Sequence, residues 1–71
     1  MKIGEAIEDL KSGLVISRTG WNAENMYLTL QTPDENSKMT LPYIYITTVS
    51  GDLVPWACST TDILADDWYV T

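Results

Sequence analysis

The stretch LVISRTGWNAENMYLTLQ, residues 14–31, contains two short apolar runs separated by a polar segment. Residues 14–18 and 26–31 are rich in aliphatic and β-branched side chains, which predicts two strands. Residues 19–25 contain glycine and asparagine and predict the turn between these strands, with Trp21 inside it. The stretch therefore raises the question of whether Trp21 belongs to the core or presents its ring to a planar ligand.

An amphipathic helix is predicted before this stretch. Ile3, Ile7 and Leu10 recur at helical spacing, and acidic residues and a lysine fill the other face, which predicts a helix over residues 3–12. Gly13 follows the last periodic residue directly and predicts the end of the helix.

A loop and a hairpin are predicted after the stretch. Residues 32–40 are almost without apolar side chains and predict a solvated loop. Residues 43–49 and 53–56 are rich in β-branched and aromatic residues, and the Ser-Gly-Asp sequence between them predicts a turn. Pro55 has no N–H to donate to a ladder, so we expect its strand at the edge of the sheet.

The last predicted elements are a single helical turn over residues 62–65 and a strand over residues 68–70. Together the elements predict an α+β fold, with one N-terminal helix packed on a small, mostly antiparallel sheet. The chain shows no internal repeat and no linker, so we expect a single domain over residues 1–71.

The size of the chain favours self-association. A chain of 71 residues and 8.0 kDa buries only about 60% of the surface that it exposes when unfolded. Cys58 is the only cysteine and there is no histidine, which excludes an internal disulfide and an ordinary zinc set. We therefore expect no metal and no cofactor, and a homo-oligomer as the remaining route to stability.

The charge disfavours several partners. Four Lys and Arg residues against ten Asp and Glu residues give a net charge of −6, which repels DNA, RNA and anionic membranes. The apolar runs are short and the first helix is acidic, so we expect neither a signal peptide nor a membrane span. A lone free thiol agrees with a cytosolic protein.

Residues with catalytic chemistry are few. Without histidine, an enzyme would depend on carboxylates, on Cys58 or on a bound metal. Asp62, Asp66 and Asp67 would suit a divalent ion, but the commoner arrangement places Asp62 at a helix start and the other two in the following turn. We interpret Cys58 as a small buried apolar residue rather than a nucleophile, because it has no basic neighbour in sequence.

Four motifs follow one another along the chain: GWN at residues 20–22 with Met26 four residues later, PYI at 42–44, a glycine at 51 followed by PW at 55–56, and S-x-T-D-x-L-A-x-D-W at 59–68. In this order and spacing they resemble the second type of Thoeris anti-defence protein, a bacteriophage family. The resemblance covers nearly the whole chain. It implies a non-enzymatic sponge, a tetrameric homo-oligomer that binds a cyclic ADP-ribose-type signal made by a Thoeris TIR-domain enzyme in the cytoplasm of the infected bacterial host. Some relatives bind other cyclic nucleotides, so the resemblance does not fix the ligand.

The sequence also departs from the family pattern. The loop over residues 32–40 is short, Ala23-Glu24 stands where relatives often have Gly-Lys, and Thr60 stands where Gln is frequent. The change at residues 23–24 removes a positive charge beside Trp21, which bears on phosphate affinity and on ligand choice.

The resemblance raises Trp21 from a core residue, as composition alone suggests, to a ligand-facing residue. Trp21 and Trp56 would stack on a base, and Trp68, which lies inside a predicted strand, is expected in the core. Hydroxyls, amides and Asp62 would meet base edges and ribose, and Arg18 and backbone N–H groups near Asp62 would meet the phosphates. The expected ligand-binding residues are Arg18, Trp21, Asn22, Met26, Trp56, Ser59, Thr60, Thr61 and Asp62, in a pocket shared by two chains.

Two other classes of function stay open at this point. The first is a small acidic inhibitor that binds a host protein by imitating nucleic acid, which the net charge of −6 suggests. The second is a metal-dependent phosphodiesterase that would use Asp62, Asp66 and Asp67 on the same signal.

Overall fold

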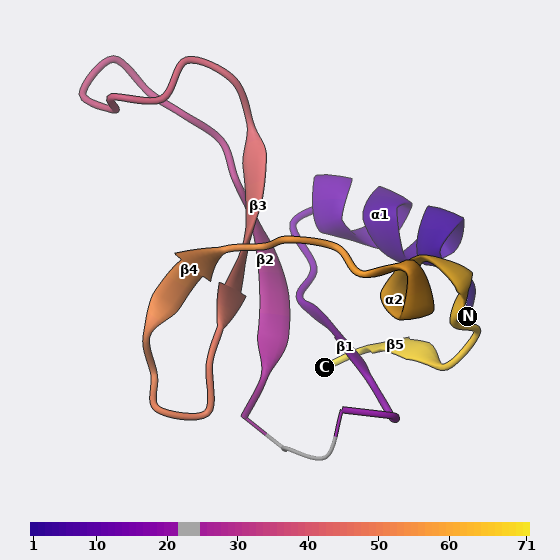
Figure 1. Ribbon diagram of the computed structural model, residues 1–71. Coiled ribbons are helices and arrows are strands. Elements are labelled where there is room, and N and C mark those ends of the chain that lie inside the picture. Colours follow the sequence, from indigo (N-terminus) through magenta and orange to yellow (C-terminus); the bar gives the residue numbers. More distant parts are fainter. Residues whose placement is uncertain (22–24) are drawn as a thin grey trace.

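A five-stranded antiparallel sheet with two helices forms the part of the chain that the computed structural model describes, residues 1–21 and 25–71. The strands lie in the order β4-β3-β2-β1-β5 (Figure 1). The elements are α1 (Ile3–Lys11), β1 (Ile16–Arg18), β2 (Tyr27–Gln31), β3 (Tyr43–Thr47), β4 (Leu53–Pro55), α2 (Thr60–Leu64) and β5 (Trp68–Val70). The predicted α+β class, the antiparallel sheet and the N-terminal helix are confirmed. Neither helix in the described residues is long and apolar enough to cross a membrane.

The first helix ends where its glycine predicts. Gly13 has a φ of 89°, a left-handed conformation that glycine adopts without a Cβ clash. Its N–H donates to the Leu10 carbonyl at 3.0 Å, and the next N–H, that of Leu14, donates to Asp9 at 3.0 Å. Residues 13 and 14 thus satisfy carbonyl groups at the end of the helix and cap it. They are therefore not part of the strand, and β1 begins at Ile16 rather than at residue 14.

Two other boundaries differ from the prediction for local reasons. The Thr48 N–H donates to the Asp52 carbonyl at 2.8 Å, so the turn begins there and β3 ends at Thr47 instead of residue 49. The Ser59 hydroxyl accepts from the Asp62 N–H at 3.1 Å and caps α2, which therefore starts at Thr60 rather than residue 62. β4 lies at the edge of the sheet, as Pro55 predicts.

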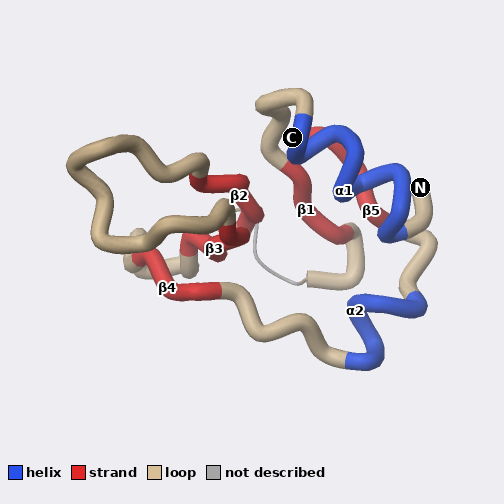
Figure 2. Tube along the Cα trace, turned by 90° about the horizontal axis from the view of Figure 1, so that it is seen from above, coloured by secondary structure: helices blue, strands red, loops and turns tan. Residues whose placement is uncertain are grey.

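The even-numbered strand residues form the core face of the sheet. The register pairs Leu28 with Ile16 on one side and with Ile46 on the other, so that these side chains point in the same direction. The buried core consists of Ala6, Leu10, Ile16, Leu28 and Trp68. Figure 2 shows α1 beside β1 and β5, whereas β3 and β4 lie further from it. The core is therefore densest at the β5 side of the sheet.

The odd-numbered strand residues form the opposite face, which we call the outer face. The register places Tyr45 opposite Thr29 and Pro55, and it places Tyr69 opposite Ser17. In the described residues α1 packs on β1, β2, β5 and α2, all through the core face. No helix of that part of the chain covers the outer face.

Leu28 gives a direct test of this core. Its side chain is 0% exposed in the middle strand, so we expect Leu28→Ala to lower the free energy of unfolding by about 2 to 5 kcal/mol through lost burial and a residual cavity. Urea unfolding followed by circular dichroism measures the change. Leu64→Ala is the matched control, because Leu64 is 78% exposed and its truncation should change stability by less than about 0.5 kcal/mol. Equal effects of the two substitutions would contradict the assignment of the core.

Candidate functional site

Arg18, the only arginine, lies at the centre of the site and bridges two carboxylates. Its Nη1 donates to Asp62 Oδ1 at 2.7 Å, and its Nε donates to Asp67 Oδ1 at 2.7 Å. β1 supplies the arginine, α2 supplies Asp62, and Asp67 directly precedes β5. Both carboxylates raise the pKa of Arg18 above its ordinary value, chiefly through the hydrogen bonds. The guanidinium thus joins three segments that are distant in sequence.

Asp62 binds more than the arginine. Its Oδ1 also accepts the indole N–H of Trp21 at 3.1 Å, and its backbone carbonyl accepts the indole N–H of Trp68 at 3.1 Å. Burial opposes ionisation of this carboxyl, but hydrogen bonds from Arg18, Trp21 and Ser59 outweigh that effect and hold its pKa below the usual range. Asp62 is therefore a buried, charged residue that fixes two indole rings.

Asp67 closes the other side of the network. Its Oδ2 accepts the backbone N–H of Gly20 at 2.8 Å, and its backbone carbonyl accepts the N–H of Thr19 at 3.2 Å. The hydrogen bond from Arg18 is the largest cause that lowers the pKa of Asp67. A Cβ on Gly20 would lie 2.9 Å from Nη2 of Arg18 and 3.0 Å from Oδ2 of Asp67, so a larger residue there would make the Arg18 and Asp67 side chains shift.

The three tryptophans meet in one cluster with Trp68 in the middle. The ring centroids of Trp21 and Trp68 are 5.3 Å apart at an interplanar angle of 79°, and those of Trp56 and Trp68 are 6.0 Å apart at 85°. Both contacts have the edge-to-face geometry that aromatic pairs favour. Trp68 is 2% exposed, so its predicted place in the core is confirmed, whereas Trp21 and Trp56 are half-buried.

Trp56 also lines a groove between α1 and the core face of the sheet. The groove has a volume of about 580 Å³, and Ile7, Leu10, Leu30 and Ile44 are among the residues that line it. The backbone N–H of Trp56 donates to the Ile44 carbonyl at 3.0 Å, which holds this part of the chain beside β3. The volume of this groove is within the range of small-molecule sites, about 300 to 1,000 Å³.

The remaining expected ligand residues are placed unevenly. Ser59 uses its hydroxyl as the cap of α2, while Thr60 and Thr61 are exposed in the first turn of that helix. Met26 lies just before β2, and its carbonyl accepts the Ser17 hydroxyl at 2.7 Å. Asn22 lies outside the residues that the structure describes. The structure thus brings Arg18, Trp21, Ser59 and Asp62 into one bonded network, and it joins Trp56 to them through Trp68.

The structure corrects the interpretation of Cys58, whereas Asp62 lies in the first turn of α2 and Asp66 and Asp67 follow that helix, as the sequence predicts. Cys58 is exposed rather than buried, because it lies on the surface connection between β4 and α2. Partial desolvation of the thiol by neighbouring atoms and the charge of Asp62 both raise the pKa of Cys58, so it does not resemble an activated nucleophile. Asp62 and Asp67 lie close together, but the guanidinium of Arg18 lies between them and bonds to both. The described residues contain no cluster of three or more His, Cys, Asp or Glu side chains that could hold a metal ion.

Asp67 and Gly20 belong to the site but were not among the predicted ligand residues. Asp67 is 49 positions from Arg18, and nothing in sequence spacing links residues that far apart. The available signals were the glycine directly before Trp21 and the aspartate directly before Trp68, each of which lies inside a family motif.

Comparison with known proteins identifies the family. The family model described as the Thoeris anti-defense 2-like domain matches residues 1–71. The chain is 36% identical over 81 aligned positions to Thoeris anti-defense 2 of Bacillus phage SP01, and the alignment covers 96% of this chain and 91% of that protein. These matches place the chain in a class of small anti-defence proteins.

The chain belongs to the Thoeris anti-defense 2-like family, which confirms the resemblance found in the motifs. Membership supports a role against the Thoeris defence, and the family is named for anti-defence rather than for a catalytic activity. Since the alignment spans 81 positions and this chain has 71 residues, the phage SP01 protein carries residues that have no counterpart here.

The network predicts a specific acid sensitivity. Asp62 and Asp67 have folded-state pKa values below their ordinary value of 3.8, so their stabilisation is complete above that pH and is lost as the pH falls below it. Asp67→Asn removes one such carboxylate, so the melting temperature should fall at neutral pH and should depend less on pH below about 4 than in the wild type. Thermal melts from pH 7 to pH 2 measure both slopes.

Asp34→Asn is the control for this prediction, because the Asp34 carboxylate accepts hydrogen bonds from Asn36 and Ser37 in its own loop and is not bonded to Arg18. It should leave the acid dependence close to that of the wild type. An Asp67→Asn profile parallel to the wild-type profile would show that the network does not stabilise the folded state.

Proposed function

We propose that this protein is a non-enzymatic anti-defence sponge. It binds a cyclic ADP-ribose-type or related cyclic nucleotide signal in the cytoplasm of the infected bacterial host and withholds it from the Thoeris defence. Family membership supports the role against Thoeris. The observation that carries the binding mechanism is the pair of half-buried rings, Trp21 and Trp56, that stand against a fixed Trp68.

Rigid aromatic rings suit a planar ligand. Stacking of a base on an aromatic side chain contributes about 1 to 3 kcal/mol and needs no particular base. The ring of Trp21 is held by its N–H bond to Asp62 and by its edge contact with Trp68, so little side-chain freedom remains to be lost on binding. Trp56 is held likewise by its packing on Trp68.

The polar residues divide into two groups in this proposal. Arg18 and Asp62 position the Trp21 ring, because their charged groups already bond to each other within the protomer. The exposed hydroxyls of Thr60 and Thr61, together with Asn22, meet ribose, phosphate or base edges. Met26, which the family motif adds to the expected ligand-binding residues, lies directly before β2.

The binding pocket is completed by a second chain. A protomer of 71 residues encloses a ligand of dinucleotide size poorly, and a cleft between subunits buries more of its surface. We therefore propose a homo-oligomer, a tetramer as in the family resemblance, with the ligand held between protomers. Sequestration needs affinity and copy number rather than bond cleavage.

Uptake and release of intact ligand test this function. The purified protein is incubated with cyclic ADP-ribose isomers, freed of unbound ligand, and heated, and the supernatant is analysed by mass spectrometry. We expect intact cyclic ligand to be recovered in the supernatant. A converted product would indicate an enzyme, and a failure to retain any cyclic nucleotide would overturn the sponge.

Trp21 variants test the site. Trp21→Ala removes the stacking surface and should weaken binding about 5- to 150-fold, the equivalent of 1 to 3 kcal/mol, with the oligomer still assembled. Trp21→Phe keeps a ring but loses the N–H bond to Asp62, so its binding should be intermediate. Isothermal titration gives the affinities and circular dichroism checks the fold. Unfolding of Trp21→Phe would assign Trp21 to the core.

A further inference from the structure

The arginine of the site is already committed inside the protomer. The guanidinium of Arg18 bonds to Asp62 and Asp67 at 2.7 Å each, and its side chain is only 13% exposed. If it turned toward a ligand, it would leave two carboxylates without their partner, which is costly for partly buried groups. In a chain with a net charge of −6, the phosphates of a nucleotide therefore need another cation close to the tryptophans.

The three lysines differ in their surroundings. Lys11 is in the last turn of α1 and lines the groove of about 580 Å³ between α1 and the core face of the sheet, which Trp56 also lines. Lys2 and Lys38 line neither this groove nor the groove on the outer face. Among the described residues, Lys11 is thus the cation that shares a groove with a tryptophan of the site.

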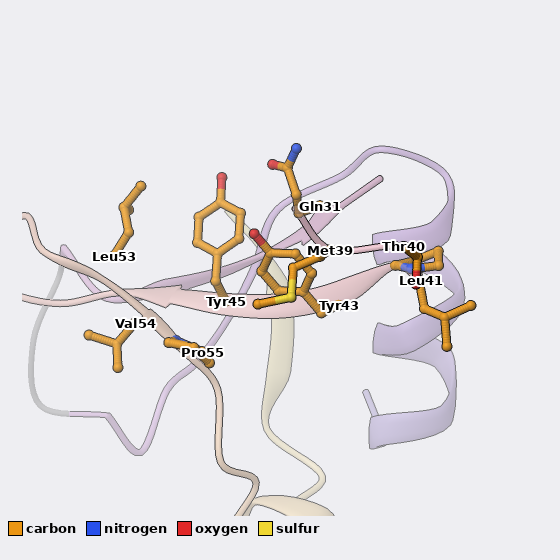
Figure 3. A pocket seen from close by; sticks show the side chains of 10 residues that line it. Gln31, Met39, Thr40, Leu41, Tyr43, Tyr45, Leu53, Val54 and Pro55 are labelled. Atoms are coloured by element: carbon orange, nitrogen blue, oxygen red, sulfur yellow. The ribbon is translucent and has the colours of Figure 1, made fainter. Parts of the chain in front are cut away.

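A second groove, on the outer face, suits a different ligand chemistry. It has a volume of about 570 Å³, and Tyr43, Tyr45 and Leu53 are among the side chains around it (Figure 3). Every residue that lines it in the described part of the chain is either apolar or carries only a hydroxyl or an amide. A phosphate would find no cation there, so the groove beside α1 is the better place for an anionic group.

The ammonium group of Lys11 is accessible to a ligand. It lies 3.6 Å from a carboxylate oxygen of Glu8, one turn earlier in α1, and the two side chains are 62% and 73% exposed. Exposed ion pairs of this kind contribute little free energy, so a phosphate can replace Glu8 at small cost. A lysine side chain also lays its apolar stem along a surface while its charge stays in water, which suits the wall of an apolar groove.

Trp56 adds a ring and a hydrogen-bond donor to the same groove. Trp21 and Trp68 donate their indole N–H groups to Asp62. Within residues 1–21 and 25–71, the indole N–H of Trp56 has no acceptor, and no buried polar side-chain atom lacks a partner. Stacking uses the face of an indole and the N–H lies at its edge, so Trp56 can hold a ring and an oxygen of one ligand.

We infer that the groove between α1 and the core face is the phosphate-binding part of the site, with Lys11 as its cation. The Lys11 ammonium and the Trp56 indole N–H meet phosphate oxygens, and the base lies toward the tryptophan cluster. Helix α1 thereby joins the site, although none of the expected ligand-binding residues lies on it. The inference rests on the proposed function, because it assigns one part of the same ligand.

Removal of the lysine charge tests the inference. Lys11→Gln replaces an exposed helix residue by another good helix former, so the fold should be kept. We expect its dissociation constant for cyclic ADP-ribose isomers to rise about 10-fold at low salt, and the difference from the wild type to shrink at 1 M salt, where charges are screened. Lys11→Arg keeps the charge and should stay within about threefold of the wild type. Isothermal titration gives the affinities, and circular dichroism checks the fold.

Two further variants serve as controls. Lys38→Gln removes the same charge from the loop before β3, which does not line this groove, and should change the affinity by less than about twofold. Glu8→Gln frees the Lys11 ammonium from its ion pair and should strengthen binding, by up to about fivefold.

The outcomes separate this inference from the proposed function. A folded Lys11→Gln chain that binds the cyclic ligand like the wild type overturns the inference and leaves the proposed function standing. Equal losses in Lys11→Gln and Lys38→Gln also overturn it, because the net charge then explains the effect. If the wild type retains no cyclic nucleotide, the proposed function fails, and linear ADP-ribose becomes the probe. Binding of ADP-ribose that weakens in Lys11→Gln then supports the inference, and any other result overturns it.

Discussion

The structure depends on the bridge that Arg18 makes between Asp62 and Asp67. One guanidinium joins β1, α2 and the segment before β5, at distances of 2.7 Å to both carboxylates. Removal of one partner from a partly buried group of this kind leaves an uncompensated charge, which costs far more than the pair contributes when it is intact. The bridge therefore fixes where Asp62 lies, and Asp62 in turn fixes the indoles of Trp21 and Trp68.

The tryptophan cluster shows how one group of rings serves both stability and recognition. Trp68 is buried and supplies the apolar contact that a small core needs. Trp21 and Trp56 make edge-to-face contacts with Trp68 and are half-buried, so part of each ring surface remains available. An indole suits this double role because its large apolar ring has a single N–H, which the carboxylate of Asp62 satisfies for Trp21.

The two faces of the sheet explain why so short a chain would function as an assembly. On the core face, Ile16, Leu28 and Trp68 are buried with Ala6 and Leu10 of α1, and the odd-numbered strand residues, which include the tyrosines, lie on the opposite face. A chain of 71 residues buries only about 60% of the surface that it exposes when unfolded. In the proposed function, another copy of the chain completes the pocket beside the tryptophan cluster.

The sequence by itself determined the elements, because apolar periodicity, Gly13 and Pro55 act over a few residues and predicted every helix and strand to within about two positions. It also placed Trp68 in the core, because a tryptophan inside a strand of a small sheet has few other places to go. Only the tertiary structure decided that Arg18 meets Asp67 from 49 positions away, that Asp62 bonds to Trp21, and that Cys58 is exposed. The physical reason is that these contacts arise from strand register and helix placement, which bring distant segments together irrespective of their spacing along the chain.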